Sequence, residues 1–150
     1  MTRKMLVCCS FVLVLAGCSK YSPQVYPKTY AVRGKVLLDD KPLSAGIVEF
    51  QPTPAADGGA APGGEASGVI QPDGTFELRT YANGRNDGAL PGKYQVIVRM
   101  VEGGEARNPK LMKAAPKIPD KYADYKTSGL TVEVKEGDNN LEPFQLKTGE

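Results

Sequence analysis

Apolar and polar residues alternate along most of this chain, which is the pattern of β-strands with one buried face. The clearest example is TFELRTY at residues 75–81, where Phe76, Leu78 and Thr80 fall on one side. Six further segments alternate or are rich in β-branched and aliphatic residues: 29–38, 46–51, 66–71, 93–101, 130–135 and 141–146. Seven short strands between turn signals predict an all-β fold, a seven-stranded antiparallel β-sandwich of immunoglobulin-like architecture.

Turn residues separate these strands. Asp39 to Pro42, Pro72 to Gly74, and Gly137 to Asn139 predict tight turns. Residues 52–64 and 83–92 are rich in glycine and proline or polar residues, which predicts loops.

The segment 103–128 is too long for a structureless loop in a compact domain. Asn108 followed by Pro109 is typical of the N-cap and first turn of a helix. We therefore expect a helix of one to two turns here, ended before Pro116.

The N-terminus has a different pattern. Residues 1–4 are MTRK, and residues 5–15 form an apolar run with one weakly polar member. A basic start, an apolar segment of this length and small residues after it are typical of a secretory signal peptide. A membrane-spanning helix needs about 20 apolar residues, so this run is too short to span a membrane.

Residues 15–18, Leu-Ala-Gly-Cys, end this segment and resemble the lipobox of bacterial lipoproteins. The resemblance implies cleavage between Gly17 and Cys18, diacylglycerol on the Cys18 thiol, and a fatty acid such as palmitate on the new amino terminus. A thiolate is the nucleophile that can accept a lipid, and two or three acyl chains hold a protein firmly at a membrane. Ser19 resembles the outer-membrane sorting signal of some bacteria, so we expect an extracytoplasmic chain at the cell membrane or the outer membrane.

These boundaries predict three parts. They are a signal peptide at 1–17, the lipidated Cys18 with a short tether at 18–27, and one β-sandwich domain at 28–148. The nine residues after the cysteine reach at most roughly 30 Å, which keeps the domain close to its membrane.

Charge and cysteine usage exclude several functions. The signal peptide takes away two basic residues and no acidic one, which leaves 17 of each in the mature chain. Nucleic-acid binding needs a basic face, so we expect no nucleic-acid partner. All cysteines other than Cys18 lie in the signal peptide, so the mature domain has no disulfide and depends on its core.

The sequence contains no histidine. This excludes Ser-His-Asp and Cys-His catalytic arrangements and the usual zinc ligand sets. We therefore expect neither a cofactor nor a metal.

Four motifs together resemble a bacterial family. They are VRGKV at 32–36 leading to KPL at 41–43, PDGTF at 72–76, GALPGKY at 88–94, and IPDKY at 118–122 through TSGL at 127–130. The combination is similar to lipoproteins with a carboxypeptidase-regulatory-like, transthyretin-like (prealbumin-like) domain, over residues 28–148. The resemblance implies a β-sandwich in the cell envelope and no particular activity.

These features favour a non-catalytic module that binds an envelope protein, peptide or glycan, or that contributes to envelope structure. Its binding surface is expected in the loops 83–91 and 103–128, because loops carry function on a rigid sandwich. Tyr122 and Tyr125 are the aromatic candidates for ligand contacts. The alternative role for both is to pack the long loop against the sandwich. The ligand and the oligomeric state remain open.

An enzyme is the first alternative function. Two catalytic families of this general fold, the hydroxyisourate hydrolases and the intradiol dioxygenases, depend on histidine. A carboxylate-based hydrolase would need two acids in a cleft, and Asp120 and Asp124 are the pair that the sequence offers.

Calcium binding is the second alternative. Asp73, Asp87 and Asp138 lie at turns, where their oxygens could hold calcium. An aspartate in a turn also commonly accepts hydrogen bonds from its own backbone.

An adhesin-type module is the third alternative. Some adhesin sandwiches join a lysine covalently to an asparagine across the domain. Lys35 lies in the first predicted strand, and Asn139 and Asn140 lie near the last one.

Overall fold

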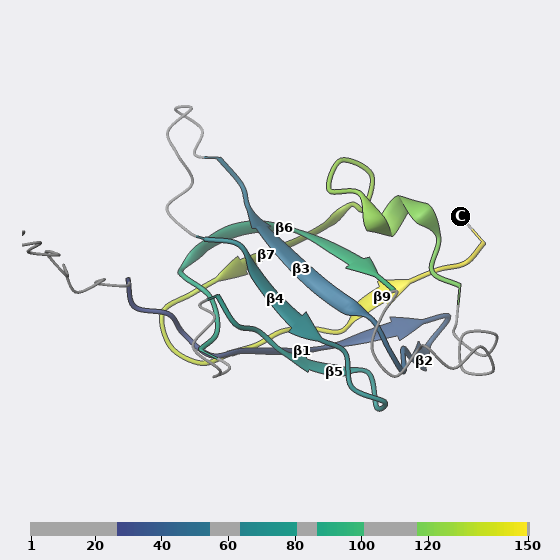
Figure 1. The fold of residues 1–150 in the computed structure, drawn as a ribbon, viewed down its shortest axis with the longest axis horizontal. Coiled ribbons are helices and arrows are strands. Elements are labelled where there is room, and N and C mark those ends of the chain that lie inside the picture. The colour runs from purple at the N-terminus through teal and green to yellow at the C-terminus, as the bar shows by residue number, and fades with distance from the viewer. Residues whose placement is uncertain (1–26, 55–63, 81–86, 101–116, 150) are drawn as a thin grey trace, which may run out of the picture.

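Two β-sheets packed face to face make up the domain (Figure 1). The computed structural model of the chain describes residues 27–54, 64–80, 87–100 and 117–149. The predicted signal peptide, Cys18 and the predicted helix with Pro109 in its first turn lie outside these residues.

The first sheet is built around β1 (Val32–Leu38). On one side β1 pairs antiparallel with β5 (Thr75–Glu77) and then with β2 (Lys41–Pro42). It also pairs in parallel with β8 (Asn139–Asn140) and β9 (Phe144–Leu146). The first sheet is therefore mixed, with its longest strand at the centre.

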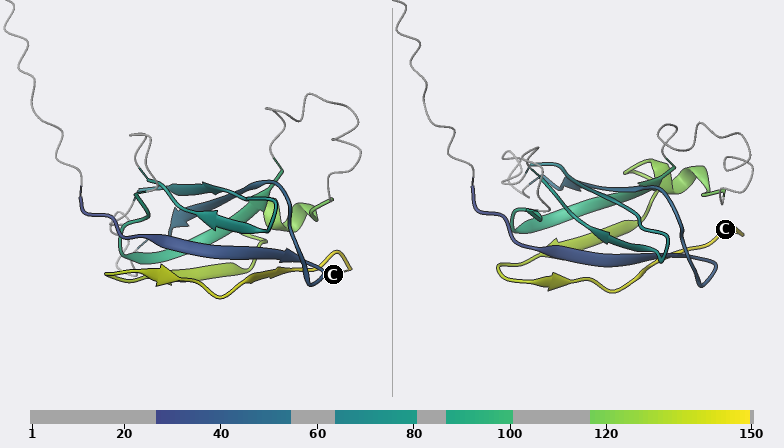
Figure 2. Two further views of the ribbon diagram at one scale, coloured as in Figure 1. Left: turned by 90° about the horizontal axis from the view of Figure 1, so that it is seen from below. Right: turned by 60° about the horizontal axis from the view of Figure 1, so that its bottom comes forward.

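The second sheet is antiparallel, and its strand order is β4-β3-β6-β7. These strands are β4 (Ala66–Val69), β3 (Ile47–Pro52), β6 (Gly92–Arg99) and β7 (Leu130–Val134). Figure 2 shows this second sheet lying over β1, while β9 lies beside β1 in the first sheet. β4 and β7 form the two edges of this sheet.

The predicted all-β sandwich is confirmed, and each of the seven predicted strands has a counterpart. The described residues contain nine strands, because β2 and β8 form where the sequence indicated turns. Asp39 and Asp40 both have positive φ, 48° and 63°. Such a two-residue turn matches the twist of a hairpin, and it pairs Leu38 directly with Lys41.

The core lies between the two sheets, and aromatic rings occupy its centre. The ring centroid of Phe50 lies 6.2 Å from that of Phe76, 5.8 Å from Tyr94 and 6.1 Å from Phe144. Phe50, Phe76 and Tyr94 are at most 1% exposed. Aromatic pairs at these separations add to the free energy gained by burying apolar area. The Tyr94 hydroxyl donates a 2.8 Å hydrogen bond to the Leu90 carbonyl, so its buried polar atom is satisfied.

Candidate functional site

The two sheets are joined at one edge by β4 and β5. Ser67 and Arg79 exchange two backbone hydrogen bonds of 2.9 Å each. Four residues closer to the hairpin turn on each strand, the Gln71 N–H donates a 2.8 Å hydrogen bond to the Thr75 carbonyl. Between these two points no ladder joins β4 to β5 in the described structure. The hairpin is thus hydrogen-bonded at both ends and unpaired in its middle.

The middle of the hairpin is unpaired because β5 is also held by the first sheet. The Leu78 N–H donates to the Val32 carbonyl at 3.0 Å, and the Val36 N–H donates to the Gly74 carbonyl at 2.9 Å. On its other side β4 belongs to the second sheet, where Ile70 N–H donates to the Gly46 carbonyl at 3.0 Å. Each hairpin strand therefore follows a different layer of the sandwich between the two closed ends.

Two glycines permit close contacts around this unpaired stretch, Gly68 with the backbone of β5 and Gly34 of β1 with the Phe76 ring. A Cβ atom on Gly68 would lie 2.6 Å from the Glu77 carbonyl oxygen, and a Cβ atom on Gly34 would lie 2.5 Å from the Phe76 ring. Neither distance is sterically allowed without movement of the neighbour. A glycine inside a strand commonly marks such an approach.

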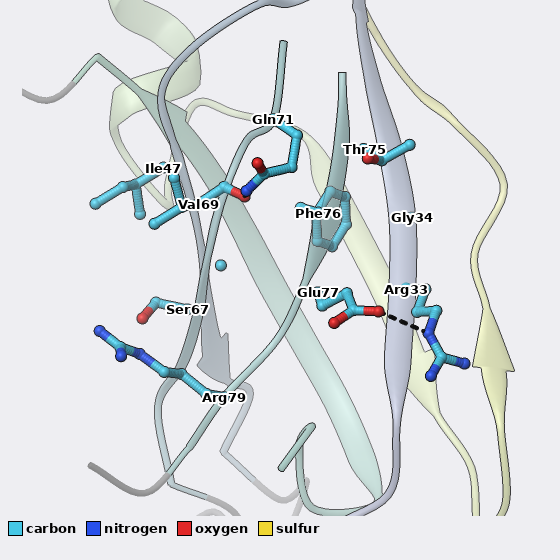
Figure 3. A pocket seen from close by; sticks show the side chains of 11 residues that line it. Arg33, Gly34, Ile47, Ser67, Val69, Gln71, Thr75, Phe76, Glu77 and Arg79 are labelled. Carbon is cyan, nitrogen blue, oxygen red and sulfur yellow. Dashed lines mark hydrogen bonds and ion pairs between the residues drawn. The ribbon is translucent and has the colours of Figure 1, made fainter. Parts of the chain in front are cut away.

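A pocket of about 760 Å³ is lined by residues of this unpaired stretch, and we call it the β4–β5 pocket (Figure 3). Ile47 and Val69 form its apolar side. They are direct cross-strand partners, and Val69 is 58% exposed. On the opposite wall the Arg33 guanidinium forms a 2.9 Å ion pair with the Glu77 carboxylate.

A second pocket of about 520 Å³ adjoins the first, and we call it the Tyr125 pocket. It shares Ser67 and Arg79 with the β4–β5 pocket. Glu49 and Arg99 form an ion pair within it. The two pockets together make one continuous surface along β4, apolar at Ile47 and Val69 and polar elsewhere.

Burial raises the pKa of the Tyr125 phenol, and the negative charges of Glu49 and Glu65 raise it further. Of the two tyrosines predicted to contact a ligand, Tyr125 is half-buried and lines a pocket. The second pocket therefore presents a neutral phenol beside an arginine–glutamate ion pair.

Arg79 differs from the other two arginines of this surface. Arg33 is bound by Glu77, and Arg99 is bound by Glu49. The Arg79 guanidinium makes no hydrogen bond or ion pair with any residue that the structure describes. Figure 3 shows its side chain beside Ser67, pointing away from the Arg33–Glu77 pair.

Tyr122 occupies a different position from Tyr125. It lies in the 3-10 helix η2 (Asp120–Ala123) and is 4% exposed, within the core cluster. Its hydroxyl accepts a 3.0 Å hydrogen bond from the Lys147 N–H, which ties the long loop to the C-terminal segment. The Lys121 ammonium lies over the Tyr122 ring, 4.9 Å from its centroid. This geometry matches the alternative role of Tyr122, which is to pack the long loop against the sandwich.

The two acids considered for hydrolysis, Asp120 and Asp124, are both exposed. The Asp124 carboxylate accepts a 2.7 Å hydrogen bond from the Lys126 N–H and so closes a local turn. Neither residue lines the two pockets described above.

The aspartates considered for calcium lie in separate turns. Asp73 accepts hydrogen bonds from the Thr75 N–H at 3.0 Å and the Thr75 hydroxyl at 2.6 Å, which lower the pKa of its carboxyl group. Asp87 accepts a 2.8 Å hydrogen bond from the Thr80 N–H, and Asp138 is exposed. Among the residues that the structure describes, no group of three or more His, Cys, Asp or Glu side chains could hold a metal ion.

The residues considered for a covalent cross-link serve other contacts. The Asn139 side-chain amide donates 2.9 Å hydrogen bonds to the carbonyls of Lys135 and Gly137. Its oxygen accepts a 2.8 Å hydrogen bond from the Lys135 N–H. Asn140 is exposed, and Lys35 helps to lower the pKa of Asp73.

Sequence reasoning missed the β4–β5 pocket and directed attention to the loops. Two signals in the segment ASGV at 66–69 could have indicated it. Gly68 interrupts a predicted strand, and Val69 places an apolar side chain on the face where Ser67 is polar.

No protein-family model, curated protein or solved structure matches the chain. Among the described residues, no helix has the length and apolar character needed to cross a membrane.

Proposed function

We propose that this chain is an extracytoplasmic lipoprotein whose β-sandwich is a non-catalytic binding module. The anchor is supported by the basic start, the apolar run and the Leu-Ala-Gly-Cys ending at residues 1–18. Diacylglycerol on Cys18 and a fatty acid on its amino group would hold the domain at the membrane surface.

The observation that carries the binding role is the continuous surface formed by the β4–β5 pocket and the Tyr125 pocket. It combines an exposed apolar side chain, Val69, with an arginine whose guanidinium has no partner in the described structure, Arg79. Binding sites commonly pair apolar surface with a few polar groups that fix orientation. The surface lies on a strand pair closed at both ends, which favours a preformed site.

A binding role is also supported by the chemistry available on this surface. The chain contains no histidine to act as a general base near neutral pH. The carboxylates Glu49 and Glu77 each form an ion pair with an arginine. We therefore propose no catalytic step.

The four motifs that resemble the transthyretin-like lipoproteins support membership of that family. Their structural roles fit a sandwich, since Asp73-Gly74 forms a turn and Tyr94 fills the core. Family membership remains part of the proposal.

Intact mass tests the anchor. The full chain would be isolated from the membrane fraction of the producing cell, as wild type and as Cys18→Ala. We expect a wild-type mass equal to residues 18–150 plus diacylglycerol and an acyl chain, and loss of the lipid and of membrane association in the variant. An unmodified chain that starts elsewhere would contradict the anchor.

Site-specific crosslinking in the same cells tests the binding module. A photoreactive residue at Val69 would report on the pocket surface, and the same residue at Gln145, exposed on β9, would be the matched control. We expect a discrete adduct from position 69 and none from position 145. Equal labelling at the two positions, or none at either, would contradict a binding role for this face.

A further inference from the structure

We propose that the β4–β5 pocket recognises the carboxylate of an extended peptide, with Arg79 receiving the carboxylate and Val69 contacting the peptide backbone and an apolar side chain. This inference rests on the proposed binding function and names its ligand class.

Arg79 is suited to a carboxylate because of its geometry and because its guanidinium has no partner in the described part of the chain. Its backbone is fixed by the paired hydrogen bonds to Ser67, while its side chain is exposed and lines both pockets. A guanidinium presents a planar fork of N–H donors that binds a carboxylate through two parallel hydrogen bonds. A ligand carboxylate at Arg79 would not have to displace an ion pair, in contrast to one at Arg33 or Arg99.

Val69 supplies backbone groups of the kind that pair with a peptide. In an antiparallel ladder, successive residues direct their N–H and C=O groups to opposite sides. Ile70 bonds to Gly46 of the second sheet, so the backbone groups of Val69 point away from that sheet and towards the pocket. The Val69 carbonyl accepts a long, 3.4 Å hydrogen bond from the Gln71 side-chain amide. A peptide N–H of normal geometry would replace this bond at a small cost.

The apolar side of the pocket favours a peptide with an aliphatic side chain near its carboxylate. Val69 and Ile47 are adjacent across β4 and β3, and both line the pocket. Burial of an exposed valine against a ligand contributes about 25 cal/mol per Å² of apolar area removed from water. Carboxylate, backbone and aliphatic contacts together describe a short acidic or C-terminal peptide segment.

The local charge balance favours a single carboxylate over a phosphate. Arg79 lines the β4–β5 pocket together with Glu77, and the Tyr125 pocket together with Glu49 and Glu65. A group with a charge of about −2 would be repelled more strongly by these neighbours than one of charge −1. A single negative charge matches the Arg79 guanidinium, which has no partner among the residues that the structure describes.

Nuclear magnetic resonance titration of the full chain in detergent tests this inference. The first probe is N-acetyl-Ala-Val-Val with a free carboxyl terminus, compared with its C-terminal amide. The second is N-acetyl-Val-Glu-Val amide, compared with the same peptide carrying Gln in place of Glu. The first pair reports a terminal carboxylate and the second a side-chain carboxylate. Saturable shifts of the Val69 amide and Arg79 side-chain signals, with a carboxylate peptide and not with its neutral partner, are expected.

Arg79→Gln is the decisive variant, and Lys93→Gln is its control. Lys93 is exposed on β6 outside both pockets, so the control removes the same charge at another place on the second sheet. Hydrogen bonds to charged groups predict roughly 10- to 100-fold weaker binding for Arg79→Gln. We expect less than a twofold change for Lys93→Gln. Amide spectra of both variants would show whether the sandwich is intact.

Three outcomes would overturn the inference. Equal binding of the acid and neutral peptides, equal weakening by both variants, or no shift at Val69 with any probe would each exclude carboxylate recognition here. If the crosslink at position 69 persists in such a case, the binding function stands and only the ligand class fails. If the crosslink is also absent, the proposed function fails with it.

Discussion

Ser67 and Arg79 exchange a pair of 2.9 Å backbone hydrogen bonds, and through them β4 of one sheet meets the chain that leaves β5 of the other. This contact covers part of the exposed edge of the second sheet. Edges with unpaired backbone groups favour association with other chains, so a covered edge protects the domain from aggregation. The same contact fixes the backbone of the arginine that we propose binds a carboxylate.

Gly68→Ala tests whether this join depends on the close approach of the two backbones. The new Cβ atom would lie 2.6 Å from the Glu77 carbonyl oxygen, and backbone cannot move away as a flexible side chain can. We expect a loss of about 1 to 3 kcal/mol in the free energy of unfolding, measured with urea, from this overpacking.

Gly64→Ala is the matched control for this change. A Cβ atom at Gly64 would meet only the end of the Thr80 side chain, at 3.3 Å. We expect little loss of stability there, or a small gain from the stiffer unfolded chain. A loss for Gly68→Ala no larger than that of the control would contradict the steric account of the pocket.

The sequence predicted the strands well because their pattern is local. Phe76 and Leu78 alternate with charged residues and are both buried, at 1% and 0% exposed. The β4–β5 pocket was not predicted, because it depends on β5 being held by β1 as well as by β4. Pairing between segments that are far apart in the chain leaves no periodic signal in either of them.

The parallel pairing of β1 with β8 and β9 was unpredictable for the same reason. The burial of single side chains, such as those of Tyr122 and Tyr125, was equally unpredictable from the sequence. They are three positions apart in one loop, yet one lies in the core and the other lines a pocket. The sequence identified both residues, but their burial is set by the fold around them.

Tyr122→Phe is expected to destabilise the domain by about 1 kcal/mol, because the Lys147 N–H would lose its acceptor. The ring itself would remain in the core, so the larger loss typical of a cavity is not expected. Urea unfolding of the variant gives the measurement. Tyr125→Phe serves as the control and should change the stability by less than about 0.5 kcal/mol, as for surface positions in general. Equal losses for the two variants would argue against the Tyr122–Lys147 tie.

Asp39→Asn should weaken the acid dependence of stability. The Thr148 hydroxyl and N–H donate to the Asp39 carboxylate at 2.6 and 3.0 Å, and these bonds lower its pKa below the ordinary 3.8. A lowered pKa in the folded state means that the unfolded state binds protons first as the pH falls. The stabilisation is therefore complete above pH 3.8 and is lost as the pH falls through the lower pKa of the folded chain.

Urea unfolding between neutral pH and pH 2 would measure this dependence. Asparagine tolerates the positive φ of 48° at this position, so the turn should persist. We expect the variant to be less stable at neutral pH and to lose less stability on acidification than the wild type. Parallel curves for the two proteins would show that the Asp39–Thr148 contact contributes nothing to the acid transition.

Tyr125 should titrate above the ordinary tyrosine pKa of 10.0, because burial and then the charges of Glu49 and Glu65 disfavour its phenolate. A raised pKa in the folded state stabilises the domain fully below pH 10.0 and less as the pH rises through the folded-state value. Ultraviolet absorbance of phenolate, compared between the wild type and Tyr125→Phe, isolates this group. Glu49→Gln should lower the Tyr125 pKa towards 10.0 without restoring it, since burial is the larger cause. An unchanged Tyr125 pKa in Glu49→Gln would mean that the Tyr125 hydroxyl lies too far from Glu49 to share one pocket with it. The continuous surface proposed for binding would then not exist.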